Sequence, residues 1–462
     1  MESTLNSPQR RVYALRRNAA AAARGGLTPQ AASTILHRHH LPRRYARVNP
    51  IVYAIPVFFA LIGLELLVAH RRRVRAYDFS DAVCSIGLGA MSQVSGIFSK
   101  LVVLAIYVAA YEHLRLFSLP AGSIAVWLSG LLLYDFLYYW HHRLGHEVGV
   151  LWAAHVVHHQ SEEFNLSTAL RQSSSGFLFG WVFYLPMALL GFPPLVFVAV
   201  GLIDLLYQYW IHTEQIGRLG WFDRVFASPS NHRVHHGVND RYLDKNYGGI
   251  LILWDRLFGT FIDEDAGEPV IYGTRAPLRR YDPVWSNLEV YAALARDAWN
   301  TRRWRDKLAL WWKPPGWRPA DVAAADPKPA FDPYTRPRYA PSVARGVQLH
   351  VAVQFVLLML IGADCLARAE QLPLAWGLGY VAWAMLSLVA LCAWLEGRRR
   401  APVLDLLRLA AALVMLLLGG GWFGAAWSLP AQAATALLLV VSIAAALILA
   451  LRRPRPAGAT PA

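Results

Sequence analysis

Long stretches of apolar residues recur along this chain, and no other feature of the sequence restricts its fold so strongly. They cover residues 51–69, 81–111, 122–141, 177–190, 195–212, 348–367, 373–395, 402–419 and 431–451. A bilayer has a hydrocarbon core about 30 Å thick, which a helix of about 20 apolar residues can cross. Only 16% of the 462 residues are charged, against about 25% in soluble domains. The sequence therefore predicts an all-α, polytopic integral membrane protein, excludes a disordered chain and argues against a fully soluble one.

Changes in composition divide the chain into four predicted regions. Residues 1–49 form a basic, low-complexity N-terminal tail, which includes His37, His39 and His40. Residues 50–285 form a membrane domain that carries the other histidine motifs, residues 286–346 a Pro- and Trp-rich linker outside the bilayer, and residues 347–462 a C-terminal region of four membrane helices. The C-terminal helices carry few polar residues, so we expect them to serve packing, lipid contact or oligomerisation rather than chemistry.

Charge and cysteine content restrict the possible partners. The net charge is +15, but the basic residues are mostly arginines beside apolar stretches, which favours contact with anionic lipid headgroups over nucleic acid. Cys84, Cys365 and Cys392 lie far apart within apolar stretches, so they predict neither a disulfide framework nor a cysteine-ligated zinc or iron–sulfur site. The bilayer is therefore the expected partner, and the oligomeric state stays open.

Three runs of arginine indicate the orientation in the membrane. They lie at residues 71–73, 398–400 and 452–455, and Lys and Arg concentrate in the cytoplasmic loops of membrane proteins. All three runs lie on one side if each apolar stretch crosses the bilayer once. This topology puts the histidine motifs on the cytoplasmic face, of the inner membrane in a bacterium or of the endoplasmic reticulum in a eukaryote. It puts the N-terminal tail outside unless residues 51–69 do not cross or residues 81–111 form a broken hairpin, so the position of the N-terminus stays open.

Nine histidines lie close together in the sequence. They form the motif HxxxH, two motifs HxxHH and one single position, namely His142 and His146, then His155, His158 and His159, then His232, His235 and His236, and His212. Residues i, i+3 and i+4 share one face of a helix. Each motif therefore presents two or three imidazoles on one side of a helix. Separate histidines with ordinary hydrogen bonds would not repeat this spacing three times, so we expect the motifs to converge on metal.

The ligand types restrict the metal. Imidazole binds zinc, copper, iron and nickel, whereas structural zinc sites usually include cysteine, and no cysteine of this chain is placed to serve. The zinc-protease motif HExxH is absent. Eight or nine neutral ligands are too many for one ion and suit two. The chemistry favours a dinuclear iron centre that activates O₂, although the spacing alone also permits two zinc ions.

Carboxylates near the motifs are candidates for orienting the imidazoles. Asp135 lies seven residues, or two helical turns, before His142, where a carboxylate that holds an imidazole is expected. Asp244 and Asp255 are further candidates, and a helix-capping or solvent-facing role is an equal alternative for each of them. His141 lies off the stripe of the first motif, so we expect it to pack or to support rather than to bind metal.

The motifs at the ends of apolar stretches resemble those of the fatty acid hydroxylase/sterol desaturase superfamily of integral-membrane di-iron oxygenases. The segments DFLYYWHHRLGHEVGVLWAAHVVHHQSEEFNLSTALRQS, QYWIHTE, NHRVHHG and DKNYGGILILWDRLFGTF are similar to its alkylglycerol monooxygenase branch. The resemblance covers about residues 51–285, and the additional C-terminal spans are also shared with this branch. It implies that residues 50–285 form a membrane di-iron domain with a cytoplasmic, histidine-rich cap.

The resemblance implies oxidative cleavage of glyceryl ethers. O₂ hydroxylates the carbon beside the ether oxygen, the hemiacetal collapses to a fatty aldehyde and glycerol, and tetrahydrobiopterin supplies the electrons. Carried over residue by residue, the metal ligands would be His142, His146, His155, His158, His159, His232, His235 and His236. Glu147 matches a functionally required Glu of that branch. His212 matches a ligand position of the wider superfamily, but the histidine that commonly accompanies it is Gln208 here.

Further predictions concern the reductant and the substrate. Haem-binding and dinucleotide-binding motifs are absent from the sequence, so the electron donor has to be external, a pterin or a separate redox protein. Arg171, with Glu147, is a candidate contact for the pterin or a lipid headgroup, and Asp135 joins Glu147 as a catalytic candidate. An apolar slot for the lipid chain is expected near the candidate residues Phe179, Phe183, Tyr184, Tyr207 and Trp210.

Two alternatives stay open at the level of sequence. A sterol or fatty acyl hydroxylase or desaturase of the same superfamily would use the same metal motifs. A membrane metal sensor or transporter would also need histidines, although a transporter is expected to place its ligands near the middle of the bilayer. Here the histidines follow the ends of apolar stretches, which favours the enzyme.

Overall fold

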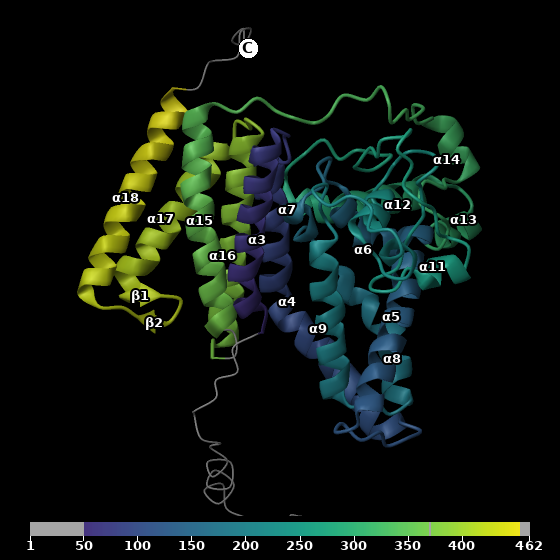
Figure 1. The fold of residues 1–462 in the computed structure, drawn as a ribbon. Helices are drawn as coiled ribbons and strands as arrows, with labels where there is room; N and C mark the ends of the chain where they lie inside the picture. The colour runs from purple at the N-terminus through teal and green to yellow at the C-terminus, as the bar shows by residue number, and fades with distance from the viewer. Residues whose placement is uncertain (1–49, 369–370, 453–462) are drawn as a thin grey trace, which may run out of the picture. The chain divides into compact units, whose positions relative to one another are not determined.

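The computed structural model describes residues 50–368 and 371–452, so the N-terminal tail with its histidines lies outside the described residues. Residues 49–462 form one compact unit. The described residues are mainly helical, as predicted (Figure 1). The longer helices are α3 (Pro50–Arg72), α4 (Phe79–Leu114), α5 (Ile124–Glu147), α6 (Gly149–His159), α8 (Gly180–Leu189), α9 (Pro194–Trp210), α12 (Pro283–Asn300), α15 (Arg345–Arg368), α16 (Leu374–Leu395), α17 (Ala401–Gly419) and α18 (Leu429–Leu451).

Short elements connect these helices. They are α7 (Leu166–Ala169), η1 (Gly176–Leu178), η2 (Phe222–Arg224), α10 (Pro229–His235), α11 (Leu253–Leu257), α13 (Trp304–Ala309) and α14 (Ala320–Ala325). A single two-stranded sheet in the described residues pairs β1 (Gly421–Trp422) with β2 (Ala425–Ala426) in antiparallel register. The left-handed conformation of Gly420 ends α17 just before this hairpin.

Five helices are long and apolar enough to cross a membrane, namely α3 from Val52 onward, α15, α16, α17 and α18. A sixth candidate is α4, which bends by 53° between Ile97 and Ser99. These helices agree with six of the predicted stretches. The structure therefore confirms an integral membrane protein of several spans.

The other three predicted stretches form helices that differ in length or composition from these candidates. Helix α8 has 10 residues and is about 15 Å long, so it cannot cross a core of about 30 Å. Helix α9 has 17 residues, or about 26 Å. Helix α5 is long enough, but it is not apolar enough, because its second half carries Asp135 and the first histidine motif. Residues 177–190, 195–212 and 122–141 therefore form helices that lack the length or the apolar character of an independent span.

The helices nevertheless run in the directions that the predicted topology requires. In Figure 1, α3 ends, α17 begins and α18 ends at the level where the loops and short helices of the cap gather. Contacts agree with this placement, because Arg72 donates to the carbonyl oxygen of Gln215 at 2.6 Å and Arg400 pairs with Asp282 at 2.7 Å. The end of α3, the start of α17 and the end of α18 thus lie at the end of the molecule that carries the histidines.

Three apolar clusters hold the helices together, and the two larger ones are the main cores. The smaller of these two cores joins the second half of α4 to α5, α8 and α9, and it includes Tyr107, Met187 and Val196. The larger core joins α4 to the C-terminal helices α15, α16 and α17, and it includes Leu88 and Trp394. Helix α4 is shared by both cores, so the C-terminal helices pack directly on the part of the molecule that carries the histidines.

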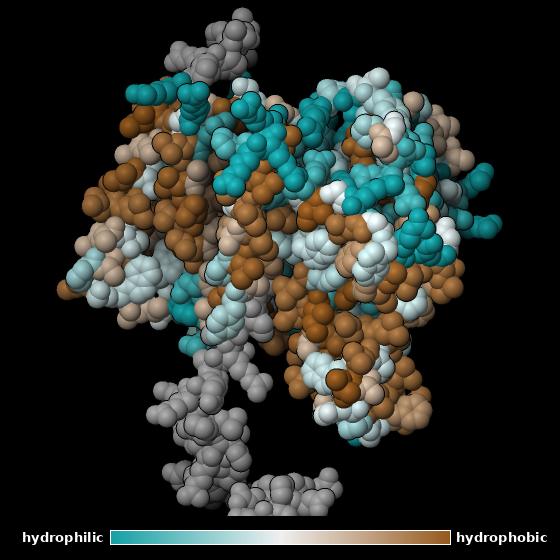
Figure 2. Space-filling view, viewed as in Figure 1, coloured by the Kyte–Doolittle hydropathy of each residue, from teal (hydrophilic) through white to brown (hydrophobic). Residues whose placement is uncertain are grey.

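The surface reflects the expected environment. Figure 2 shows hydrophobic side chains along the flanks of the helices and hydrophilic side chains over the end that carries the cap. Large apolar residues on the outer helices are solvent-exposed in the absence of lipid, for example Leu437 and Val441 on α18. An exposed apolar surface of this extent is typical of a protein embedded in a bilayer.

Candidate metal centre

The nine predicted histidines converge in two buried clusters. The first cluster contains His142, His146, His155, His159 and His235, and the second contains His158, His212, His232 and His236. Within each cluster one ring nitrogen from every histidine lies within 4.8 Å of those of the others. The convergence that the spacing predicted is therefore present, and His212 belongs to it even though Gln208 stands where a histidine companion was expected.

Each HxxHH motif contributes to both clusters, and the two motifs do so in opposite ways. On α6, His155 and His159 face the first cluster and His158 faces the second. In the second motif, on α10 and the residue after it, His232 and His236 face the second cluster and His235 faces the first. The i and i+4 residues of one motif thus meet the i+3 residue of the other. The clusters are in contact, since the rings of His159 and His236 stack at 4.3 Å.

Backbone carbonyl groups orient four of the rings. The Nδ1 atom lies within hydrogen-bond distance of a carbonyl oxygen, at 2.7 Å in His142 (from Tyr247), 2.8 Å in His158 (from Arg171), 2.7 Å in His212 (from Gln208) and 3.0 Å in His235 (from Lys245). Nδ1 therefore carries the proton and donates it, which leaves the lone pair on Nε2. This arrangement is typical of histidines that bind metal through Nε2.

The Nε2 atoms face one another at short distances. His155 Nε2 lies 3.2 Å from His142 Nε2 and 3.0 Å from His159 Nε2, and His212 Nε2 lies 3.1 Å from His158 Nε2 and 2.9 Å from His232 Nε2. The buried Nε2 atoms of His146 and His235 have no hydrogen-bond partner among the described residues. Facing lone pairs repel unless a cation lies between them, and unpaired buried nitrogens are costly. The donor set therefore fits two metal ions, one in each cluster.

Burial keeps six of these imidazoles neutral. It lowers the pKa of His158 to about 4. Burial also lowers the pKa values of five other histidines well below the usual range, and the neighbouring imidazoles reinforce this shift. These histidines are His155, His159, His232, His235 and His236. The rings are therefore deprotonated at neutral pH, which is the form that binds metal.

Local sequence signals explain why these segments adopt the required shape. Ser228 caps α10 by accepting a hydrogen bond from the backbone N–H of Asn231, whose side chain in turn accepts from the N–H of Ser228. The carboxylate of Asp255 accepts the N–H groups of Tyr247 and Gly248, both at 2.7 Å. Asp255 thereby fixes the loop whose Tyr247 carbonyl orients His142, and burial raises its pKa to about 6. Its predicted supporting role thus acts through the backbone.

Asp135 differs from the prediction. Its carboxylate accepts the N–H of Ile250 at 2.7 Å, the N–H of Leu251 at 3.1 Å and the indole N–H of Trp254 at 2.8 Å. It contacts no imidazole in the described part of the chain. The helical spacing predicted the face of the helix on which Asp135 lies, but not the loop that packs against that face. Asp135 anchors the segment before α11, and a catalytic role for it stays a prediction. Asp244 lies nearer, with Oδ1 3.6 Å from Nδ1 of His146.

The remaining predicted contacts lie on two sides of the clusters. Glu147 ends α5, is partly exposed and accepts a hydrogen bond from Arg143 at 2.9 Å. The guanidinium of Arg171 is buried among protein groups, including the carbonyl of Val157 at 2.7 Å. Arg171 therefore holds the second cluster through its own carbonyl and the end of α6. A pterin contact for either residue stays a prediction.

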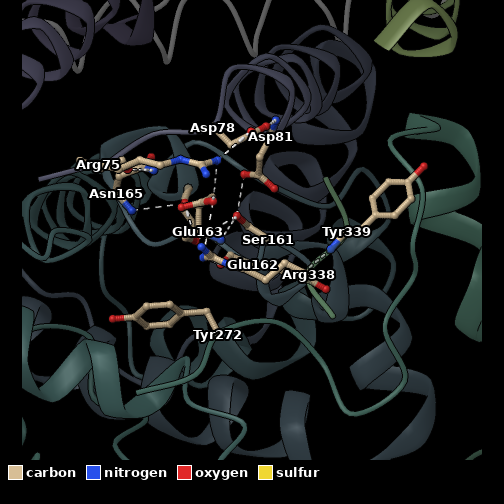
Figure 3. A network of polar contacts seen from close by, with 12 residues as sticks. Arg75, Asp78, Asp81, Ser161, Glu162, Glu163, Asn165, Tyr272, Arg338 and Tyr339 are labelled. Atoms are coloured by element: carbon tan, nitrogen blue, oxygen red, sulfur yellow. Dashed lines mark hydrogen bonds and ion pairs between the residues drawn. The ribbon is translucent and has the colours of Figure 1, made fainter. Parts of the chain in front are cut away.

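A network of charged side chains fixes the loop that follows α6 (Figure 3). Ser161 donates to Asp81 at 2.6 Å, the N–H of Tyr339 donates to Glu162 at 2.9 Å, and Glu163 lies 3.4 Å from Arg338. Directly after these anchored residues, Phe164 stacks on the ring of His212 with the ring centroids 5.5 Å apart. The network thus holds one wall of the second cluster, and it draws on the predicted linker, which supplies Arg338 and Tyr339.

A cavity of about 560 Å³ opens onto both clusters. It reaches His142 and His155 of the first cluster and His158 and His212 of the second. Its size lies in the range of small-molecule sites, about 300–1,000 Å³. Of the aromatic candidates, Phe179 and Tyr184 line it. The other three make protein contacts: Phe183 packs on His141, Tyr207 donates to the carbonyl of Ala227, and Trp210 packs on Phe222.

Two polar features beside the clusters, a buried tyrosine and a short hydrogen-bonded chain, were not among the predicted site features. Tyr247 is fully buried, its hydroxyl has no partner in the described part of the chain, and its ring lies 5.4 Å from that of His146. Tyr138 donates to Gln208 at 2.6 Å, and Gln208 donates to Asp204 at 2.7 Å. Tyr247 could have been found from the sequence because it lies in the segment DKNYGG. Tyr138 and Asp204 could have been found because they are polar residues inside apolar stretches.

Comparisons with known proteins agree with this geometry. The fatty acid hydroxylase family pattern matches residues 127–260, which contain all nine histidines of the clusters. The human alkylglycerol monooxygenase is 36% identical over 79% of this chain and 82% of its own length, and that of Danio rerio is 37% identical over 79% and 81%. An ornithine lipid hydroxylase of Rhizobium tropici is 34% identical over 29% of this chain and 40% of its own length. No solved structure shows a significant match.

The similarity to the animal proteins extends well beyond the residues of the family pattern, because it spans about four fifths of both chains. The chain therefore belongs to the fatty acid hydroxylase family and, within it, to the group that includes the animal alkylglycerol monooxygenases.

Proposed function

We propose that this protein is a membrane-bound di-iron monooxygenase that hydroxylates the carbon beside the ether oxygen of glyceryl ether lipids. The observation that carries the proposal is the cavity that leads to both histidine clusters from within the helical region. The named activity of the animal relatives supports the substrate class. Product release as aldehyde and a glycerol derivative follows from collapse of the hemiacetal.

The nine clustered histidines are the proposed iron ligands. The first cluster would hold one iron and the second the other, with the carbonyl groups of Tyr247, Arg171, Gln208 and Lys245 fixing four of the rings. When bound, the iron pair would supply the O₂ activation that C–H hydroxylation requires. The chain itself provides neutral ligands, which leave the metal charge uncompensated, and a buried site that excludes water.

The polar part of the cavity wall is the proposed site of the headgroup. Helices α5, α8 and α9 contribute Tyr138, His141, Tyr184, Asp204 and Gln208 to the lining. The Nδ1 atom of His141 is buried without a partner in the described part of the chain. Hydroxyl groups of a glycerol headgroup offer both donors and acceptors to this wall. The wall would hold the headgroup beside the clusters and so place the adjacent carbon at the metals.

Further proposals concern the reductant, catalysis and the orientation in the membrane. Glu147 and Arg143 lie at the surface next to the first cluster, where a reduced pterin such as tetrahydrobiopterin, or another external donor, would deliver electrons. Arg171 is retained as a candidate contact for the reductant or headgroup and Asp135 as a candidate catalytic residue. We propose that the cap faces the cytoplasm because Arg72 and Arg400, from two of the arginine runs, contact it. We also propose that residues 50–285 form the di-iron domain, flanked by the tail, the linker and the C-terminal helices.

The decisive experiment gives the purified, iron-loaded full chain a labelled alkylglycerol together with a tetrahydropterin. We expect fatty aldehyde to form with consumption of O₂, and His232→Ala serves as the matched inactive control. Turnover of a sterol or an acyl lipid, with none of the ether, would contradict the substrate class. Absence of lipid-dependent O₂ uptake with a full complement of metal would contradict the monooxygenase and favour metal sensing.

A further inference from the structure

One face of the C-terminal helix α15 lines the cavity. Met359, Gly362, Ala363 and Leu366 all contact it. Their spacing of i, i+3, i+4 and i+7 is that of a single stripe along a helix. Figure 1 shows α15 beside α3 and α16, and it packs against α3 and α4. A helix outside the family pattern of residues 127–260 thus forms part of the cavity wall.

Gly362 leaves an opening in this stripe. It is buried, yet a Cβ atom built on it would meet no atom of the described residues within 4 Å. Two other glycines that line the cavity are in tight contact, since a Cβ on Gly89 would lie 2.0 Å from the carbonyl oxygen of Leu170 and one on Gly201 would lie 2.9 Å from the hydroxyl of Tyr134. Glycine is unfavourable in a helix interior, and helix packing does not require it at this position. Its effect is to widen the cavity.

The part of the cavity beside α15 is the apolar part. Facing α15 are Ile55 and Phe58 from α3 and Ile86 and Val94 from α4, whereas the polar lining residues come chiefly from α5, α8 and α9. The polar exceptions on α4, Gln93 and Lys100, bond to each other at 2.6 Å. An alkyl chain gains most by burial against apolar surface. It therefore belongs beside α15, with its polar end toward the opposite wall.

The dimensions suit a single chain. Along α9 the lining runs from Gly201 to Tyr209, a rise of about 12 Å, and it continues past the end of the helix to His212. One leaflet of the hydrocarbon core is about 15 Å thick. A chain of membrane lipid can thus be enclosed over most of its length, so the walls sense how long and how bulky it is.

We propose that the α15 stripe, with Gly362 at its opening, selects the length and bulk of the alkyl chain that this enzyme oxidises. The proposal rests on the proposed lipid monooxygenase activity. It gives the C-terminal helices a part in substrate choice, which the sequence analysis did not expect of them. The metal clusters would set the reaction, and α15 would set which lipids reach it.

The test measures kcat/KM of the full chain for alkylglycerols with short, medium and long saturated chains. For Gly362→Phe we expect the ratio of long-chain to short-chain kcat/KM to fall on the order of tenfold, the scale on which apolar pockets discriminate size. Gly362→Ala should change the ratio in the same direction by less. Gly63→Phe is the matched control, because an added Cβ there also meets nothing but Gly63 is exposed on α3, away from the cavity.

Metal content and thermal unfolding establish that each variant is folded. An unchanged long-to-short ratio in folded, metal-loaded Gly362→Phe overturns the proposal. A wild-type protein that oxidises no ether lipid overturns the proposed function instead. In that case the lipids that co-purify with each variant are compared by mass spectrometry, where loss of long chains from Gly362→Phe alone supports the selective wall and identical profiles contradict it.

Discussion

The histidine clusters and the C-terminal helices both enclose ionisable side chains, but their hydrogen bonding differs. Between the C-terminal helices, Asp405 accepts from His350 at 2.7 Å, from Arg408 at 2.7 Å and from Trp394 at 2.9 Å. Arg408 continues to Gln354, which donates to Ser442, each at 2.8 Å. In the clusters, by contrast, nitrogen lone pairs face each other or have no partner in the described residues.

This difference separates a structural polar group from a site that lacks a ligand. A buried network whose donors and acceptors all pair off stabilises one arrangement of the helices and has nothing left to offer. A buried set of lone pairs aimed at one point is costly until a cation arrives. Both regions contain histidine, so residue type alone does not distinguish them.

The largest expected effect is removal of a ligand from a cluster. His232→Ala should lower lipid oxidation more than about 100-fold, since changes to the outer partners of metal ligands alone cost 10–100-fold. Iron per chain, measured by elemental analysis, should fall with it. His350→Ala is the matched control from the C-terminal network and should keep its iron. Equal loss of iron in both variants would break the comparison between the two regions.

A second prediction concerns stability. Asp405→Ala leaves Arg408 buried without its carboxylate partner, so we expect a loss of about 3 kcal/mol in the free energy of unfolding, as for other broken buried pairs. Denaturant unfolding in detergent measures it. Asp364→Ala removes the partner of Arg368 at a half-exposed site on α15, where such pairs contribute about 0–1 kcal/mol. Similar losses in both variants would show that burial does not govern this network.

The smallest expected effect is a pH dependence at the charged network. Burial raises the pKa of Glu163 to about 7, although Arg338 and Arg75 oppose the shift and Asp81 and Asp78 reinforce it. A raised pKa means that the folded state binds the proton more tightly. The stabilisation is complete below the ordinary value of 4.5 and is lost as the pH rises through about 7. In Glu163→Gln the melting temperature should therefore depend less on pH between these two values, by about 2–4 °C. An unchanged slope would place the titration elsewhere.

The helical class, the membrane location and the convergence of the histidines were predictable because each follows from periodicity. Apolar runs identify spans, and i, i+3, i+4 spacing puts imidazoles on one face. The exchange of His158 and His235 between clusters was not predictable, because it depends on how α6 and α10 lie against each other. Asp135 shows the same limit, since its helix face was evident but the loop at Ile250 was not. The pair of helices at 177–190 and 195–212, with its break at Pro193 and Pro194, was predictable, but the shortness of α8, which has 10 residues, was not.

The exchange of imidazoles between the two HxxHH motifs has a consequence for assembly. Neither ion can take its place by ordering one helix alone, because every site draws from α6 and from α10 or the residue after it. Binding of the first ion would fix α6 and α10 relative to each other, which would also place the nitrogens of the second cluster for binding the second ion. Occupancy should therefore rise steeply with free metal, and half-loaded molecules should be rare.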